Sequence, residues 1–313
     1  MIEELGEVLI TEPPPPADPV ATLPFPFNQH TFCRYEPIEK RVEAARVLVV
    51  DCLLRNEKDI SDVARTEWGT AAPIEIRRER KIAGMAIENI LGNIERLVKN
   101  PVTEVTHLAS IAAAAAEFGP DAIVLSGTLR DFDYYNPKLL ESFGEFIRAT
   151  KTPVLAICGG HQLVGMSFGA HVVTLDRLEQ HEQRINRPLE YQYRFIRITN
   201  SKDAIFKGMA NPSSGLWQDY TTEARVLRVW QNHGLQLDRI PEGFDLLATS
   251  YLCRNQMMVK RSDGQLIYAV QFHLEKSFED WNKSRTRWEH QNESRDGRIL
   301  FENFLLLALA HSS

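Results

Sequence analysis

The sequence predicts an α/β protein with a doubly wound, mostly parallel sheet. Three short apolar runs, at 46–54, 122–125 and 154–157, are typical of strands that are buried on both faces. Helical patterns over 109–118 and 137–150 lie between them, and strands that alternate with helices at this spacing favour parallel pairing. In such a fold the functional site is expected at the carboxyl ends of the strands.

The chain begins with a proline-rich stretch. Residues 13–16 are consecutive prolines, and Pro19, Pro24 and Pro26 follow. Proline excludes a regular helix or a central strand. We therefore expect residues 1–45 to form an N-terminal extension, either a disordered tail or an arm laid over the surface, and residues 46–313 to form the folded domain.

The remaining elements are predicted from periodicity and turn signals. Ile82, Ile90, Ile94 and Leu97 recur at helical spacing, and Asn100-Pro101 is expected to end that helix. The polar stretch 176–193 is either a lid or a plain surface loop. Further strands are expected at 102–108, 194–199, 226–230, 244–250, 256–260 and 266–272, and a closing helix at 297–310.

Composition excludes several classes of function. The chain has 313 residues, 43% hydrophobic composition, a formal net charge of −6 and a pI of about 5.9. It can bury a core, but it has no basic footprint for nucleic acid or an anionic membrane. No signal peptide is expected, because the N-terminal residues lack a basic region followed by an apolar run, and no apolar stretch reaches the ~20 residues that span a bilayer. We therefore expect a cytoplasmic protein with neither nucleic acid nor membrane as a partner.

The residues that bind metals in proteins are scattered. Cys33, Cys52, Cys158 and Cys253 form no metal-like pairs, and the nine histidines are spread singly, so no metal is expected. The sequence also contains neither a phosphate-binding loop nor a dinucleotide-binding glycine motif. No cofactor is expected.

The strand predicted at 154–157 ends at Cys158, and a helical pattern follows at once. A nucleophile on such an elbow has a strained backbone and needs small neighbours, which Ala156 and Gly160 supply. The helix N-terminus favours a thiolate at Cys158, and the Gly159 N–H points where an oxyanion would form. A lone cysteine after an apolar run is more typically structural, so the interpretation depends on a second motif.

That motif is the apolar run 266–272, which delivers His273 at its end and Glu275 two residues later. A spacing of two places both side chains on the same side of an extended chain. Glu275 would then orient His273, and His273 would hold Cys158 as a thiolate, which is the arrangement used in covalent catalysis. A lone histidine here would be structural, but the pairing of both motifs favours a catalytic site.

These motifs resemble those of the class I glutamine amidotransferases. Residues 156–162 (Ala-Ile-Cys-Gly-Gly-His-Gln) are similar to the family's Gly-x-Cys-x-Gly-x-Gln elbow, and residues 270–275 (Val-Gln-Phe-His-Leu-Glu) to its Gln-Phe-His-Pro-Glu motif. Residues 121–127 resemble the strand and turn that supply the other half of the oxyanion hole. Residues 229–234 resemble its Trp-x-Ser-His-Gly segment. The motifs occur in the family's order.

The resemblance implies a role for each matching residue. The catalytic triad would be Cys158, His273 and Glu275, the oxyanion hole would be formed by Gly127, Thr128 and Gly159, and the substrate would be contacted by Gln162 and His233. The implied fold is the flavodoxin-like class I amidotransferase fold. The first crossover of that fold is one helix, so the longer stretch 55–100 is interpreted as an insertion.

Two residues depart from the family pattern. Thr128 stands where a second glycine is usual, and its β-branched side chain resists a positive φ. The oxyanion hole would then form differently, or only after a partner binds. Leu274 replaces the proline between His273 and Glu275, which leaves their spacing intact.

The implied activity is hydrolysis of the glutamine amide by a glutaminase subunit that supplies ammonia to a separate synthase. Two alternatives stay open. One is a γ-glutamyl hydrolase or peptidase that uses the same triad on a γ-glutamyl substrate. The other is a non-catalytic regulator of the same fold.

Overall fold

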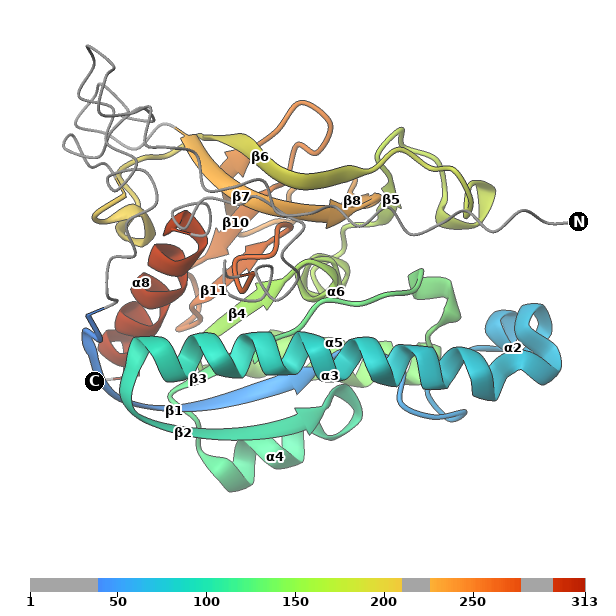
Figure 1. Cartoon of the computed structure of the whole chain (residues 1–313), viewed down its shortest axis with the longest axis horizontal. Coiled ribbons are helices and arrows are strands. Elements are labelled where there is room, and N and C mark those ends of the chain that lie inside the picture. Colours follow the sequence, from blue (N-terminus) through green and yellow to red (C-terminus); the bar gives the residue numbers. More distant parts are fainter. Residues whose placement is uncertain (1–38, 210–225, 277–294, 313) are drawn as a thin grey trace, which may run out of the picture.

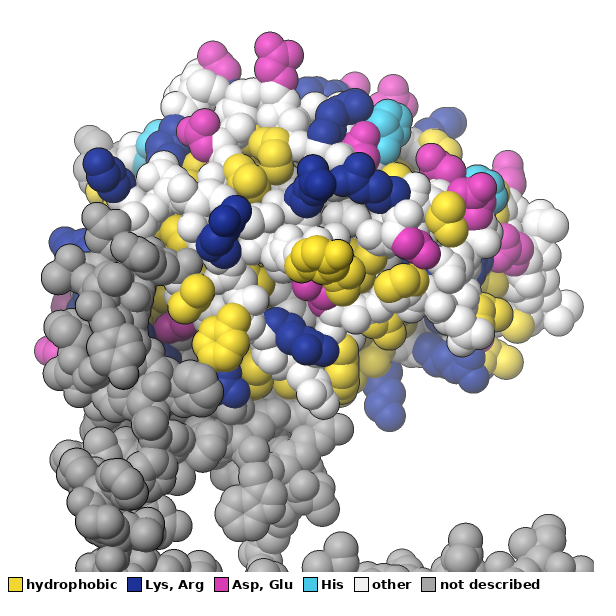
Figure 2. Space-filling view, turned by 90° about the horizontal axis from the view of Figure 1, so that it is seen from above, with side chains coloured by type: hydrophobic (Ala, Val, Ile, Leu, Met, Phe, Trp, Pro, Cys, Tyr) yellow, Lys and Arg dark blue, Asp and Glu magenta, His cyan; other side chains and the backbone are white. Residues whose placement is uncertain are grey.

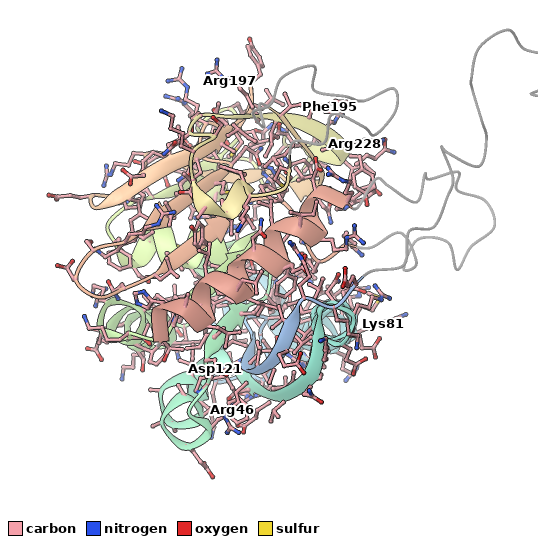
Figure 3. The ribbon with its side chains drawn as sticks, turned by 90° about the vertical axis from the view of Figure 1, so that its left-hand side faces the viewer. Arg46, Lys81, Asp121, Phe195, Arg197 and Arg228 are labelled. Carbon is pink, nitrogen blue, oxygen red and sulfur yellow. The ribbon has the colours of Figure 1, made fainter. Side chains whose placement is uncertain are left out.

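The computed structural model describes residues 39–209, 226–276 and 295–312 (Figure 1). Residues 1–38 lie outside this part, so the expected N-terminal extension stays a prediction. The first described strand, β1 (Val42–Asp51), begins at Val42 rather than at the predicted Arg46. The backbone N–H of Arg46 donates to Asp121 Oδ2 at 2.7 Å, which ties β1 to the start of its neighbour (Figure 3).

A nine-stranded sheet carries the site. Its order is β2, β1, β3, β4, β11, β10, β9, β6, β7, and β5 and β8 form a separate antiparallel pair. Pairing is parallel from β2 to β11 and antiparallel from β11 to β7. The other strands are β2 (Val98–His107), β3 (Ala122–Leu125), β4 (Val154–Ile157), β5 (Val172–Thr174), β6 (Glu190–Ile198), β7 (Val226–His233), β8 (Leu235–Leu237), β9 (Phe244–Thr249), β10 (Met257–Lys260) and β11 (Ile267–Val270).

Helices cover both faces of the sheet. One core cluster joins the sheet to α3 and α8, and a second joins it to α4, α5 and α6 (Figure 1). Alternate residues of β1 explain this, because Val47 and Val49 belong to the first cluster and Leu48 and Val50 to the second. The predicted α/β class is confirmed. The helices are α2 (Asp62–Trp68), α3 (Ala72–Leu97), α4 (Ile111–Phe118), α5 (Pro137–Ala149), α6 (Gly159–Ser167) and α8 (Arg295–Ser312).

The predicted end of the long helix was wrong. The helix α3 stops at Leu97, and β2 already begins at Val98 and includes both Asn100 and Pro101. β2 is the last strand at its edge of the sheet, where the missing N–H of a proline is tolerated. Asn100 is anchored there, because its side chain donates to the Glu43 carbonyl oxygen at 3.2 Å.

The antiparallel edge of the sheet has an exposed outer face. Tyr191 and Phe195 of β6 are exposed, and hydrophobic and basic side chains share the surface seen from above (Figure 2). The guanidinium of Arg228, on the neighbouring β7, lies 5.9 Å from the Phe195 ring centre (Figure 3). Within the described part of the chain, no helix is long and apolar enough to cross a membrane.

Glycine is required where α6 leaves the sheet. A Cβ atom at Gly160 would lie 2.8 Å from the Ser126 carbonyl oxygen and 3.0 Å from Leu125 Cβ, whereas one at Gly84 in α3 would meet nothing within 4 Å. We predict that Gly160→Ala lowers the free energy of unfolding by about 1–3 kcal/mol through overpacking. The matched control Gly84→Ala should raise it by about 0.5–1 kcal/mol. Urea denaturation measures both, and equal effects of the two substitutions would contradict this account.

Candidate active site

Cys158 lies on a strained turn between β4 and α6. Its backbone has φ 51° and ψ −107°, a conformation that residues with a side chain rarely adopt. The turn is fixed to the adjacent strand, because the Cys158 N–H donates to the Val270 carbonyl oxygen at 2.7 Å. This is the geometry expected of a nucleophile elbow.

The elbow packs directly against the turn at Gly127 and Thr128, which was predicted to form part of the oxyanion hole and is called the oxyanion turn below. A Cβ atom at Gly159 would lie 2.0 Å from Thr128 Oγ1 and 2.4 Å from the Thr128 backbone nitrogen. Gly159 is therefore required for the close approach of these two turns. Thr128 is not among the described non-glycine residues with a positive φ, so its β-branched side chain meets no backbone conflict there.

His273 follows β11, and Glu275 orients its ring. His273 Nδ1 lies 2.6 Å from Glu275 Oε1, and the Glu275 carboxylate is buried. The segment is held from two sides, because the His273 N–H donates to the Trp230 carbonyl oxygen at 2.8 Å and Asn93 Nδ2 donates to the Glu275 carbonyl oxygen at 2.6 Å. Asn93 belongs to α3, so this long helix helps to hold Glu275 in place.

The charges around His273 favour an imidazolium. Burial alone would lower the pKa of His273, but the charges of Glu275 and of Cys158, and hydrogen bonds with both side chains, raise this pKa well above its ordinary value. A protonated His273 beside Cys158 can give its proton to a leaving group, as general acid catalysis requires.

Gly127 lies between the cysteine and the histidine. A Cβ atom on Gly127 would lie 3.4 Å from His273 Cε1, 3.5 Å from Cys158 Cβ and 3.9 Å from the Gly159 nitrogen. The structure therefore brings together the predicted triad and the three residues predicted for the oxyanion hole. A nucleophile, a base and an orienting acid beside two backbone turns fit acyl transfer through a covalent intermediate.

Gln162 and His233, the predicted substrate contacts, are both buried. Gln162 Nε2 donates to the Leu235 carbonyl oxygen at 3.0 Å and to Gln271 Oε1 at 2.9 Å. The two ring nitrogens of His233 lie 2.9 Å from the same Leu235 oxygen and 3.1 Å from Glu190 Oε2. These contacts support the turn between β7 and β8, and a contact of either residue with substrate stays a prediction.

Sequence reasoning missed Gln271. Its Nε2 lies 3.7 Å from Cys158 Sγ, so it links the nucleophile to Gln162. The side chain is completely buried. A polar residue two positions before His273, in an otherwise apolar run, was the available signal.

Ion pairs clamp the loop that follows the oxyanion turn. Arg130 contacts Glu75 and Glu79 of α3 at 2.6 and 2.9 Å. From the other side, Arg184 and Arg187 contact Asp131 at 2.9 and 2.8 Å. The stretch 176–193, predicted to be either a lid or a surface loop, is thus joined to the site region by charge, and its last residues already belong to β6.

Comparisons with known proteins agree with this geometry. The family model of glutamine amidotransferase class-I matches residues 86–289. A glutamine-hydrolysing GMP synthase subunit of Methanothermobacter thermautotrophicus is 28% identical over 187 residues, which cover 59% of this chain and 73% of that subunit. The glutamine-hydrolysing GMP synthase of Pectobacterium atrosepticum is 30% identical over 164 residues, which cover 50% of this chain but only 26% of that enzyme.

A solved structure shares the fold. A putative GMP synthase subunit from Thermoplasma acidophilum superposes with a TM-score of 0.52 and 22% identity, over 85% of this chain and 95% of that one. The family match spans more than half of the sequence, and it settles the class of protein: the chain belongs to the class I glutamine amidotransferase family. The resemblance predicted from the motifs is confirmed, and with it the class of enzyme, one that takes nitrogen from the glutamine amide.

The raised pKa of His273 leads to a prediction about Glu275. Glu275→Gln removes a negative charge 2.6 Å from the ring, so the pKa of His273 should fall and the imidazolium should be lost at lower pH. We expect the alkaline limb of kcat/KM to move to lower pH, with kcat reduced by roughly 10²-fold or more. Imidazole NMR shifts and rates measured against pH test this. Glu302→Gln, which changes a buried carboxylate on α8, is the control, and an unmoved limb in Glu275→Gln would refute the assignment.

The raised pKa of Glu79 predicts that the free energy of unfolding depends on pH. Burial raises the pKa of its carboxyl to about 7, although Arg130 opposes the shift. A carboxyl with a raised pKa stabilises the folded state below its unfolded pKa, and this contribution is lost as pH rises to the folded value. Between pH 4.5 and 7 the free energy of unfolding should therefore fall by up to about 3 kcal/mol.

Glu79→Gln should remove this part of the slope, and Glu88→Gln, an exposed change on the same helix, should keep it. Urea denaturation at a series of pH values provides the comparison. The same slope in wild type and Glu79→Gln would show that Glu79 does not titrate in this range.

Proposed function

We propose that Cys158, His273 and Glu275 carry out the glutamine hydrolysis of this family, and that the ammonia passes to a synthase on a separate chain. One observation carries the proposal: the thiol stands on a positive-φ turn that packs against both the oxyanion turn and the His273–Glu275 pair. A structural cysteine needs no strained backbone, whereas a nucleophile that must project from a strand end does.

The proposed reaction begins at Cys158. Its thiol proton passes to His273 while the sulfur attacks the side-chain amide carbon of glutamine, and the resulting oxyanion is held by backbone N–H groups of Gly159 and of the Gly127–Thr128 turn. The His273 imidazolium gives its proton to the leaving nitrogen, so ammonia departs and a thioester remains. His273 then takes a proton from water as the water oxygen attacks the thioester, and it returns this proton to the sulfur when the C–S bond breaks, so glutamate and the thiol are released.

The relatives support a separate acceptor. Those from Methanothermobacter, Thermococcus and Thermoplasma are named as GMP synthase subunits, whereas the longer Pectobacterium enzyme is named simply as GMP synthase. The matched region is about half of the Thermococcus protein, 56% of its length. We propose that the ammonia acceptor is a synthase of this kind.

We also propose the limits of the domain and a cytoplasmic location for the protein. The amidotransferase domain would extend over 46–313, with 55–100 as an insertion whose long helix α3 brings Asn93 to Glu275 and Glu79 to Arg130. Cys52, Cys158 and Cys253 are free thiols, which fits a cytoplasmic compartment.

Ammonia release by the purified full chain tests the proposed residues. Cys158→Ala should reduce release from glutamine by roughly 10³-fold or more. Cys52→Ala, at a buried cysteine outside the site, should retain it. A γ-glutamyl peptide is assayed in parallel, because cleavage of the peptide without glutamine hydrolysis would favour a γ-glutamyl hydrolase. No turnover of either substrate, even with a GMP-synthase-type partner present, would contradict the proposal.

A further inference from the structure

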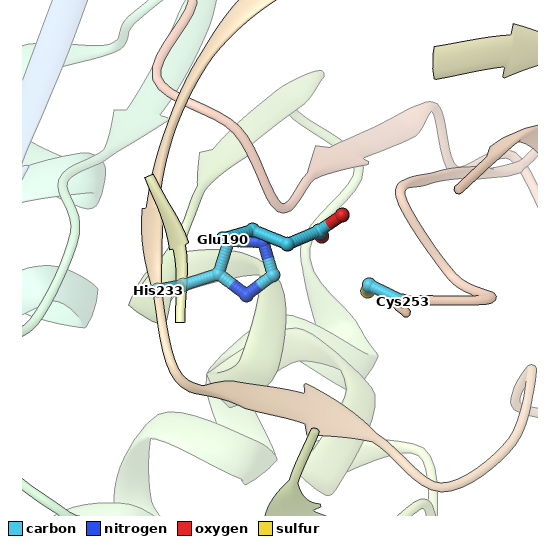
Figure 4. A group of neighbouring side chains, drawn as sticks. All are labelled: Glu190, His233 and Cys253. Carbon is cyan, nitrogen blue, oxygen red and sulfur yellow. The ribbon is translucent and has the colours of Figure 1, made fainter. Parts of the chain in front are cut away.

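Three buried side chains of types that can bind metal ions converge at one end of the β6–β7 pair. Glu190 begins β6, His233 ends β7 and Cys253 lies in the loop between β9 and β10 (Figure 4). One ligand atom from each lies within 4.8 Å of the other two, and all three residues are buried. Local sequence patterns could not indicate the cluster, because its members are separated by long stretches of chain and only β-sheet pairing brings them together.

The contacts of His233 leave a place for a proton or a metal ion between its ring and Glu190. Its Nδ1 lies 2.9 Å from the Leu235 carbonyl oxygen, which can only accept, so Nδ1 carries the proton. In the neutral ring, Nε2 then presents a lone pair, and it faces Glu190 Oε2 at 3.1 Å. Two buried acceptors at this distance repel each other unless a proton or a metal ion lies between them.

The surroundings favour a metal ion. Ser250 Oγ donates to Glu190 Oε1 at 2.8 Å, and Gln256 Nε2 donates to Glu190 Oε2 at 2.6 Å. Together with the bond from His233 to the Leu235 carbonyl, this is the outer layer of hydrogen bonds that orients histidine and carboxylate ligands in metal sites. A shared proton would not need the third donor, whereas the nitrogen, sulfur and oxygen set suits zinc.

We propose that Glu190, His233 and Cys253 bind a divalent cation of the zinc type. Ligands on one zinc ion lie roughly 3–4 Å apart, which the His233–Glu190 pair already satisfies, and the sulfur has to approach by about 1 Å at most. The Cys253 thiol now contacts the Asn255 carbonyl oxygen at 3.4 Å. On binding, the metal–sulfur bond forms, the S–H bond breaks and one proton leaves to solvent.

The bound cation would have a structural role, because it would hold residues that support the amidotransferase site. The Leu235 carbonyl oxygen accepts from His233 and from Gln162, so the cation would fix the turn that holds Gln162. Gln162 in turn bonds to Gln271, whose amide lies beside the Cys158 sulfur. The proposal itself does not depend on glutamine hydrolysis, because it concerns binding alone.

The test is metal binding by the full chain in a Cys158→Ala background, so that the triad thiol takes no metal. We expect one zinc per chain by elemental analysis, one proton released from Cys253, and a thiolate-to-cobalt charge-transfer band after replacement of zinc by cobalt. Cys253→Ser should abolish the band and weaken zinc binding at least about 100-fold in competition with a chromophoric chelator, because loss of a ligand should cost at least as much as the roughly 10–100-fold that follows loss of an outer hydrogen-bond partner. Cys52→Ser should leave both unchanged.

Glu190→Gln, which keeps the size of the side chain, gives the second variant should Cys253→Ser fail to fold. It should weaken zinc binding without removing the cobalt–thiolate band. Absence of stoichiometric zinc, or a band that persists in Cys253→Ser, would overturn the proposal. A strongly downfield imidazole proton shared by His233 and Glu190 in the zinc-treated protein would also overturn it, in favour of a proton at this position.

Discussion

The strained backbone of Cys158 is the constraint on which the rest of the site depends. A positive φ at a residue with a side chain costs of the order of 1–3 kcal/mol, and it persists only where the surroundings over-determine it. Here the hydrogen bond to Val270 fixes the turn from β11, while Gly159 and Gly160 allow the neighbouring turn and strand end to approach within van der Waals distance. The same contacts that hold the strain also bring the oxyanion turn to the sulfur.

The electrostatics of the site follow from that placement. His273 is held between a buried carboxylate and the thiol, so its charged form is favoured where burial alone would oppose it. The supports of this pair come from distant parts of the chain. Asn93 of α3 donates a hydrogen bond to the Glu275 carbonyl oxygen. Gln162 donates to Gln271, whose amide nitrogen contacts the Cys158 sulfur. The helix α3 and the β7–β8 turn thus position residues of the candidate site.

Sequence patterns predicted the central strands of the parallel half of the fold and the strand ends that carry the proposed catalytic residues. β3 and β4 have the predicted bounds, because short apolar runs between turn signals leave few alternatives, and Cys158, His273 and Glu275 stand at strand ends that the pattern marks. The limits of α3 and β2 were missed because the position of β2 at the sheet edge decides whether Pro101 is tolerated. Arg130–Glu79 and the Glu190–His233–Cys253 cluster depend on pairings between distant segments, which no local pattern encodes.

The central claim is that the elbow presents Cys158, and no other described cysteine, to a glutamine-shaped ligand. The most direct measurement is covalent labelling with a diazoketone analogue of glutamine, followed by mass spectrometry of the digested protein. A single adduct is expected on Cys158, prevented by excess glutamine, with Cys52 and Cys253 unmodified because both are completely buried, whereas Cys158 is 6% exposed. Adducts on Cys52 or Cys253, or an unlabelled Cys158 that a simple alkylating reagent still modifies, would contradict it.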